Sequence, residues 1–168
     1  MNELDRLIAI EGIRNIKASY WYFMDTKQWD KLGMVFTRDA VVDFRGERDL
    51  KPGEAYDRLT PVEQAVAEGD VAVARGRDNI VAFIRGVVEF WTTVHHGAAP
   101  IIDIIDQTNG KAIWPLFDYI DDGNHALKGY GHYHETYRPE EDGIWRIDTL
   151  QLTRLRSDGE HPAAFVPK

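Results

Sequence analysis

Apolar side chains recur at spacings of three and four along the first part of the chain, which predicts an amphipathic helix over residues 3–24. Asp25 and Thr26 follow this helix directly, and their side-chain oxygens could cap a second short helix within "KQWDKLGMVF". The segment "AVVDF" is then typical of a short strand. The apolar face of the first helix comprises Leu7, Ile10, Ile13, Ile16, Tyr20 and Phe23.

Residues 45–77 interrupt this pattern. The segment is charged, contains two prolines and four glycines, and has weak periodicity, which is typical of a long connection or an insertion. It either folds over a site as a lid loop or stays in solvent, and the pattern leaves both open. Asp78 can cap the next predicted helix, "NIVAFIRGVVEFW".

From Thr92 onward the pattern changes to that of strands. Four candidates, "APIIDIID", "GKAIWPLFDYID", "LKGYGHYHETYRP" and "GIWRIDTLQLTRLR", are separated by the turn sequences "QTNG", "DDGN" and "EEDG". Residues 157–168 read as a C-terminal arm. We therefore predict one α+β domain over residues 1–168, with N-terminal helices packed on a strongly curved mixed or antiparallel sheet that encloses one deep, cone-shaped pocket.

Charge and composition restrict the class of protein. A net charge of −8 and a pI near 5.2 argue against a partner that is nucleic acid or an anionic membrane. There is no cysteine, which excludes disulfides and Cys-ligated zinc. The charged N-terminus does not resemble a signal peptide, and no apolar run approaches the ~20 residues of a spanning helix. We expect a cytoplasmic protein.

Asp118 departs from the pattern around it, because strict alternation in its strand places it on the same face as Trp114 and Leu116. A buried acid at this position needs a partner that holds it charged, or else desolvation raises its pKa. A bulge, or a position at a strand end, would instead turn it outward. Both interpretations remain open from the pattern alone.

Three further features suggest chemistry. His95 and His96 are adjacent at a helix-to-strand junction, so at most one of them is expected to enter a pocket. His132 and His134 share a strand face, but without a third ligand at a suitable spacing we expect a solvent-facing or subunit-facing strand and no metal site. Arg154 follows two leucines on one strand face and is either an edge residue reaching solvent or an anchor for an anion.

No phosphate-binding or hydrolase motif accompanies these residues. The sequence contains no G-x-G-x-x-G, no P-loop and no G-x-S-x-G elbow. Nucleotide binding and serine hydrolase chemistry are therefore disfavoured. Aspartate, histidine, tyrosine and arginine in an apolar setting favour acid–base chemistry without a cofactor.

Several segments in a fixed order resemble the SnoaL-like family of the nuclear transport factor 2-like superfamily, in particular its dehydratase and dehydrochlorinase members. They are "IEGIRNIKASYWYFMDTKQWDKLGMVFTRDAVVDF", "VHHG", "AIWPLFD", "GHYHETYR" and "DGIWRID". Together they cover most of the chain, whereas residues 46–78 and the C-terminal tail have no counterpart.

The resemblance implies roles for five residues. Asp25 and His95 match the family's base dyad, in which the aspartate orients the histidine that removes a proton. Tyr20 and Asp118 match groups that could assist the leaving oxygen, and Arg154 matches an arginine that could hold an anion. For substrate contacts we expect the apolar residues Phe23, Trp114, Leu116 and Phe117.

The resemblance also implies a function. We expect a cofactor-independent lyase that performs a dehydratase-type elimination on a hydrophobic cyclic or aromatic small molecule. A carbon–carbon lyase, for example one that releases formaldehyde from a lignin-derived aromatic diol, an isomerase or a polyketide cyclase would suit the same residues. A non-catalytic ligand-binding or assembly module is the alternative of another class. We also expect a homo-oligomer, with a trimer favoured over a dimer.

Overall fold

The computed structural model describes residues 1–51 and 53–160, and within them one seven-stranded sheet forms the centre of the protein. The strand order is β2-β1-β7-β6-β5-β3, and β4 also pairs with β5. β1 runs parallel to β7, and the other pairs are antiparallel. The strands are β1 (Phe36–Asp43), β2 (Val73–Arg75), β3 (Thr92–Gly97), β4 (Ile101–Ile104), β5 (Gly110–Asp121), β6 (Ala126–Pro139) and β7 (Trp145–Gly159).

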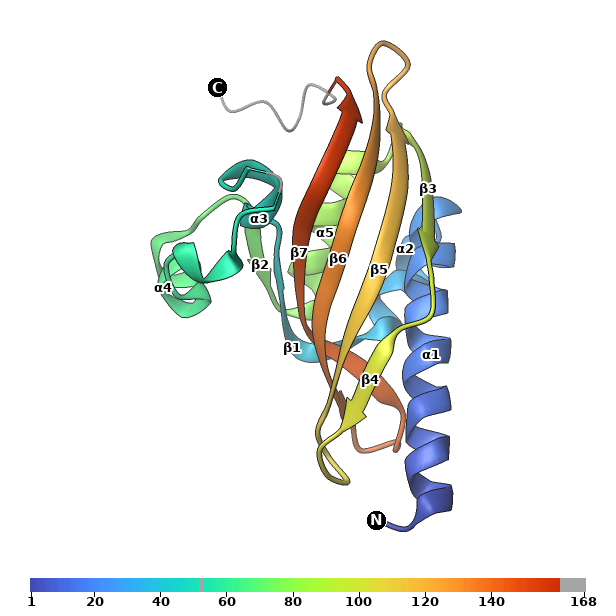
Figure 1. Ribbon diagram of the computed structural model, residues 1–168. Coiled ribbons are helices and arrows are strands. Elements are labelled where there is room, and N and C mark those ends of the chain that lie inside the picture. Colours follow the sequence, from blue (N-terminus) through green and yellow to red (C-terminus); the bar gives the residue numbers. More distant parts are fainter. Residues whose placement is uncertain (52, 161–168) are drawn as a thin grey trace.

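The helices α1, α2 and α5 lie on one face of this sheet, behind it in Figure 1. This arrangement confirms the predicted α+β fold with a curved mixed sheet. None of the helices in the described part of the chain is long and apolar enough to cross a membrane. The helices are α1 (Glu3–Asp25), α2 (Trp29–Leu32), α3 (Arg45–Arg48), α4 (Val62–Glu68) and α5 (Arg77–Val88), with 3-10 turns at Gly33–Val35 and Tyr56–Arg58.

The buried stripe of α1 differs from the predicted apolar face. Leu7 is 62% exposed, whereas Lys17 is completely buried on the sheet side. The pattern was misleading because apolar residues also flank the stripe that packs on the sheet, and a buried lysine is not recognisable from periodicity. The buried residues of this helix are Ala9, Ile13, Lys17, Tyr20 and Met24.

Local corrections concern element boundaries. Asp25 is the last residue of α1, and the short α2 helix begins after Gln28, which makes no side-chain cap. The N-cap of α5 is Gly76, so Asp78 lies in its first turn and does not cap it. Residues 157–159 of the predicted C-terminal arm continue strand β7, and 161–168 lie outside the described residues.

A further correction is that the two adjacent histidines lie on a strand. Residues 92–97 form β3, which pairs with β5 along its whole length. The pair of histidines followed by glycine hid the strand, although Thr92, Thr93 and Val94 are the β-branched residues that strands favour.

The 45–77 segment is folded against the sheet edge, beside β1 and β7 (Figure 1). Arg45 makes a buried ion pair with Asp43 and also donates to Thr60. Gly46 lies so close to β7 that an added Cβ would stand 2.2 Å from the carbonyl oxygen of Leu152. A side chain at this position would therefore displace the segment from the strand.

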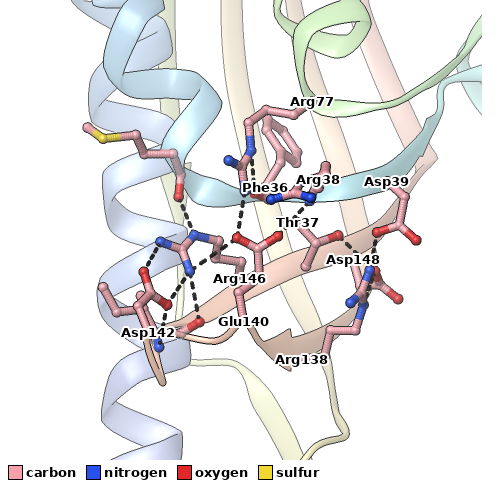
Figure 2. A network of polar contacts seen from close by, with 12 residues as sticks. Phe36, Thr37, Arg38, Asp39, Arg77, Arg138, Glu140, Asp142, Arg146 and Asp148 are labelled. Carbon is pink, nitrogen blue, oxygen red and sulfur yellow. Dashed lines mark hydrogen bonds and ion pairs between the residues drawn. The ribbon is translucent and has the colours of Figure 1, made fainter.

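At the opposite end of the sheet, the β6–β7 hairpin is tied to β1 and α5 by the polar network shown in Figure 2. Glu140 accepts hydrogen bonds from the Arg38 amide at 2.7 Å and from Arg77 at 2.8 Å. Arg146 pairs with Asp142 at 2.7 Å and donates to the carbonyl of Met34 at 3.0 Å. These contacts tie the turn between β6 and β7 to β1, to the first turn of α5 and to the 3-10 turn before β1.

We expect Glu140→Gln to lower the free energy of unfolding by about 1–3 kcal/mol at pH 7. Burial alone would raise the pKa of Glu140, but the Arg38 amide and the Arg77 guanidinium lower it below its ordinary value of 4.5. A lowered pKa stabilises the fold above the ordinary value, and this contribution is lost as pH falls through the folded-state pKa. The difference from the wild type should therefore shrink in urea unfolding at pH 3.

The exposed neighbour Glu141 provides the control for this experiment. Glu141→Gln removes the same charge, and its effect should be small at both pH values. A loss at Glu140→Gln that is equally large at pH 3 and pH 7 would contradict a contribution from the ionised carboxylate.

Candidate active site

The carboxylate of Asp25 reaches from the end of α1 to strand β3 and contacts His95 twice. Its Oδ1 lies 2.6 Å from the ring Nδ1, and its Oδ2 accepts the His95 backbone N–H at 2.8 Å. The two contacts fix the position of the imidazole relative to the helix. The His95 side chain is only 5% exposed, so little water competes for the Asp25 contact.

A second layer of polar groups supports Asp25. Thr93 donates its hydroxyl to Oδ1 of Asp25 at 2.9 Å, and the Lys27 ammonium donates to the Thr93 hydroxyl, also at 2.9 Å. Lys27 has a left-handed backbone with φ of 58°, which turns the chain directly after α1. Thr93 shares a strand face with His95, and this spacing of two is the signal that could have identified it from the sequence.

His95 faces a cavity between the helices and the inner face of the sheet, with about 530 Å³ of empty space including its mouth. Most of the lining side chains are apolar, and the polar ones come from four strands and two helices. The lining residues are Tyr20, Met24, Phe44, Glu47, Phe83, Ile84, Val87, Val88, His95, Asp118, Ile120, Tyr133, Leu152 and Arg154.

Strand register places the polar lining residues in a row. His95 on β3 is the direct partner of Asp118 on β5, and Asp118 is the partner of Gly129 on β6. Arg154 on β7 reaches across β6 to Asp118, with Nη1–Oδ1 and Nη2–Oδ2 distances of 2.9 and 2.8 Å. A Cβ at Gly129 would lie 2.2 Å from both partners, so the ion pair needs glycine at this position.

The orientation of two predicted residues is thereby settled. Asp118 faces inward and is 2% exposed, without the outward-turning bulge that the sequence left open. Arg154 is 6% exposed and does not reach solvent as an edge residue would. Both side chains belong to the polar end of the cavity.

Glu47 is a charged lining residue that the sequence did not single out. It lies on α3, in the 45–77 segment, and its carboxylate pairs with Nε of Arg154 on the side opposite Asp118. Burial alone would lower the pKa of Arg154, but the charges of Glu47 and Asp118 raise it above its ordinary value. Arg154 is therefore a cation held between two carboxylates.

Two buried tyrosines, Tyr20 and Tyr133, complete the polar lining. Their rings meet edge to face at a centroid distance of 6.0 Å. Burial raises the pKa of both phenols well above the usual range, so each hydroxyl stays protonated and can donate a hydrogen bond. Alternation along β6 could have identified Tyr133, because His132 and His134 beside it point to the other face.

The four residues expected to contact substrate are not among those that line this cavity. Trp114 and Leu116 face inward but are buried in the core, where Trp114 donates to the Tyr137 hydroxyl at 2.9 Å. Phe117 packs on the other face of the sheet against His96 and Tyr130. Phe23 is half-buried at the edge of the core. The apolar lining of the cavity comes instead from residues such as Phe83 and Val87 of α5.

The paired histidines of β6 lie away from the cavity. The ring centroids of His132 and His134 are 6.3 Å apart on the outer face of the sheet. Within residues 1–51 and 53–160, no group of three or more metal-binding side chains is present.

The chain is similar in sequence and in fold to several known proteins. The model of the SnoaL-like domain matches residues 5–151. The protein named "Probable cyclase FGR4" of Gibberella zeae is 25% identical over 148 residues, which cover 85% of this chain and 89% of the relative. Among solved structures, hexachlorocyclohexane dehydrochlorinase LinA-type3 of Novosphingobium barchaimii LL02 superposes with a TM-score of 0.72 at 16% identity, covering 99% of this chain and all of that one.

A second solved structure, ActVI-ORFA of Streptomyces coelicolor, superposes with a TM-score of 0.60 at 10% identity, over 86% of this chain and 96% of that one. At such low identities the structural matches concern the fold. The domain match covers most of the chain, including α1, the Asp25–His95 contact and the first part of β7. On this evidence the chain belongs to the SnoaL-like domain family.

Proposed function

We propose that this protein is a cofactor-independent lyase that eliminates water or a similar small group from a hydrophobic cyclic or aromatic molecule. The observation that carries the proposal is the contact between His95 and Asp25 at one side of a largely apolar cavity. A buried imidazole with an oriented carboxylate partner is the usual arrangement of a general base. The similar proteins named as a dehydrochlorinase and a cyclase fit the same type of chemistry.

In this mechanism Asp25 selects the tautomer of His95. Because the carboxylate accepts the proton on Nδ1, the unprotonated nitrogen is Nε2, which can take a proton from a substrate carbon next to an activating group. The electrons of that C–H bond form the new double bond as the leaving group departs from the adjacent carbon. Asp25 then stabilises the imidazolium, and Thr93 and Lys27 hold Asp25 in place.

Tyr20 is the best candidate to donate a hydrogen bond to the leaving oxygen, which departs as water once it takes up the proton that His95 removed. Its phenol is neutral and lines the cavity beside Met24. Asp118 is less suited to assist the leaving oxygen, since both of its carboxylate oxygens already accept hydrogen bonds from Arg154. We assign to Asp118 and Arg154 the positioning of substrate hydroxyl groups at the polar end of the cavity.

A screen of alicyclic and aromatic alcohols for loss of water, followed by absorbance of the new double bond, tests the proposal. On an identified substrate, Tyr20→Phe should lower kcat about 10²-fold or more with a small change in KM, because the hydroxyl acts mainly in the transition state. Tyr22→Phe, which alters an exposed tyrosine of the same helix, is the matched control. Full activity in Tyr20→Phe would remove Tyr20 from the mechanism.

Ring closure is a second candidate function. The observation that favours it is the 25% identity to a protein named a cyclase over 85% of this chain. Proton removal by His95 from a carbon next to a carbonyl would start a cyclisation as well as an elimination. Product analysis in the same screen separates the two, because cyclisation without dehydration leaves the mass unchanged.

A further inference from the structure

We propose that Glu47 makes the cavity selective for uncharged ligands by cancelling the charge of Arg154. The inference deepens the proposed function, since it concerns the substrate class of the same cavity. It starts from the segment 45–77, which supplies a carboxylate to the polar end of the site.

The charges that line the cavity are unequal. Glu47 and Asp118 each contribute a carboxylate, and Arg154 is the cation between them. The side chains of all three are nearly inaccessible to solvent, with exposed fractions of 2, 2 and 4%. A third carboxylate, that of Asp25, lies behind His95, where the nearby Lys27 ammonium opposes its charge, so the excess comes from Glu47 and Asp118. An anionic ligand would lose its hydration in this cavity and meet an excess of negative charge.

Arg154 is placed so that it does not offer its charge to a ligand. Asp118 occupies the terminal nitrogens on one side and Glu47 occupies Nε on the other. The usual carboxylate-binding edge of a guanidinium is the bidentate one, and Asp118 already takes it. The Asp118 oxygens keep lone pairs that can accept hydrogen bonds from hydroxyl or amide groups of a ligand.

The position of Glu47 is built into the fold. Gly46 allows α3 to lie against the carbonyl of Leu152. The Arg45–Asp43 pair holds the start of the segment, and Gly53 donates its amide to the Arg154 carbonyl at 2.7 Å. The segment thus contacts both the backbone and the side chain of Arg154. These two contacts keep Glu47 beside the guanidinium.

Benzamide and benzoate test the proposal, because they have nearly the same shape and differ in charge at pH 7. Dissociation constants are measured by chemical-shift titration of the ¹⁵N-labelled protein. The wild type should bind benzamide at least about tenfold more tightly than benzoate, which corresponds to ~1.4 kcal/mol. In Glu47→Gln the preference should fall to about one or reverse, because Arg154 then keeps a single carboxylate partner.

Glu54→Gln is the matched control, since it removes the same charge from the surface of the same segment, where Glu54 pairs with Arg58. It should keep the benzamide preference. Equal affinities of the wild type for the two probes, no binding of either, or an unchanged preference in Glu47→Gln would each overturn the proposal. If Glu47→Gln fails to fold, Glu47→Asp, which keeps the charge, should retain the wild-type preference.

The predicted preference for benzamide over benzoate does not depend on catalytic turnover. His95→Ala should lose activity and still prefer benzamide, because the cluster that selects against charge lies on β5, β7 and α3. A protein that shows the preference without any lyase activity would refute the proposed function alone. An active lyase that binds benzoate as tightly as benzamide would refute the role of Glu47 alone.

Discussion

Replacing either member of the Asp25–His95 pair should reduce kcat about 10²–10⁴-fold while leaving the fold intact. His95→Ala removes the base itself. Asp25→Asn keeps the size of the side chain but cannot accept the Nδ1 proton in the same way, which leaves His95 free to adopt the wrong tautomer. Steady-state kinetics on the substrate identified by screening, together with circular dichroism, gives the measurement.

Two comparisons sharpen this test. His96→Ala alters the adjacent histidine, which is exposed and points to the other face of β3, so its kcat should stay near the wild-type value. The double variant His95→Ala/Asp25→Asn should be no slower than His95→Ala, because residues that act as one unit are not additive. Near-normal turnover in both single variants would end the dyad mechanism. No turnover by the wild type in the screen would instead favour a non-catalytic binding module.

The Asp25–His95 pair could be predicted from local sequence patterns only in part. Helix periodicity places Asp25 at the end of α1, and adjacency of the two histidines limits the cavity to one of them. The contact between positions 25 and 95 comes from the family resemblance, since no local pattern relates residues 70 positions apart. For Asp118 and Arg154 strand alternation left the orientation open, and the resemblance favoured the inner face, where both side chains lie.

Other parts of the site could not be foreseen for physical reasons. Glu47 lies in a segment with weak periodicity, and its position depends on tertiary contacts made by Gly46 and Arg45. Thr93 and Lys27 act through Asp25, and such supporting contacts depend on the register between β3 and the end of α1. Registers of this kind are set by the packed core, which local propensity does not describe.

Lys17 is another residue whose role depends on packing, and its substitution should have the largest effect on stability. Its ammonium is completely buried, forms an ion pair with Glu135, and lies 3.5 Å from the ring centroid of Tyr133 and 4.3 Å from that of Tyr20. Glu135 also accepts the Tyr137 hydroxyl. Burial lowers the pKa of Lys17 to about 8, against the opposing effect of Glu135, so it is still a cation at pH 7.

Lys17→Met should therefore lower the free energy of unfolding by about 3–5 kcal/mol at pH 7, because it leaves the Glu135 carboxylate buried without its cation. Glu135→Gln should lower the free energy of unfolding by a similar amount, because it leaves the Lys17 ammonium buried without its anion. Urea unfolding followed by tryptophan fluorescence measures both effects. Lys31→Met, which changes an exposed lysine on α2, is the matched control and should stay within about 0.5 kcal/mol of the wild type.

The double variant Lys17→Met/Glu135→Gln separates the strength of the pair from the penalty of breaking it. If the pair chiefly avoids an uncompensated buried charge, the double variant should be clearly more stable than the sum of the two single losses predicts, with a coupling energy of about 1–3 kcal/mol. Additive losses would mean that the two groups contribute independently. Lys17 lies against the rings of Tyr20 and Tyr133, which line the cavity, so the pair also supports that part of the lining.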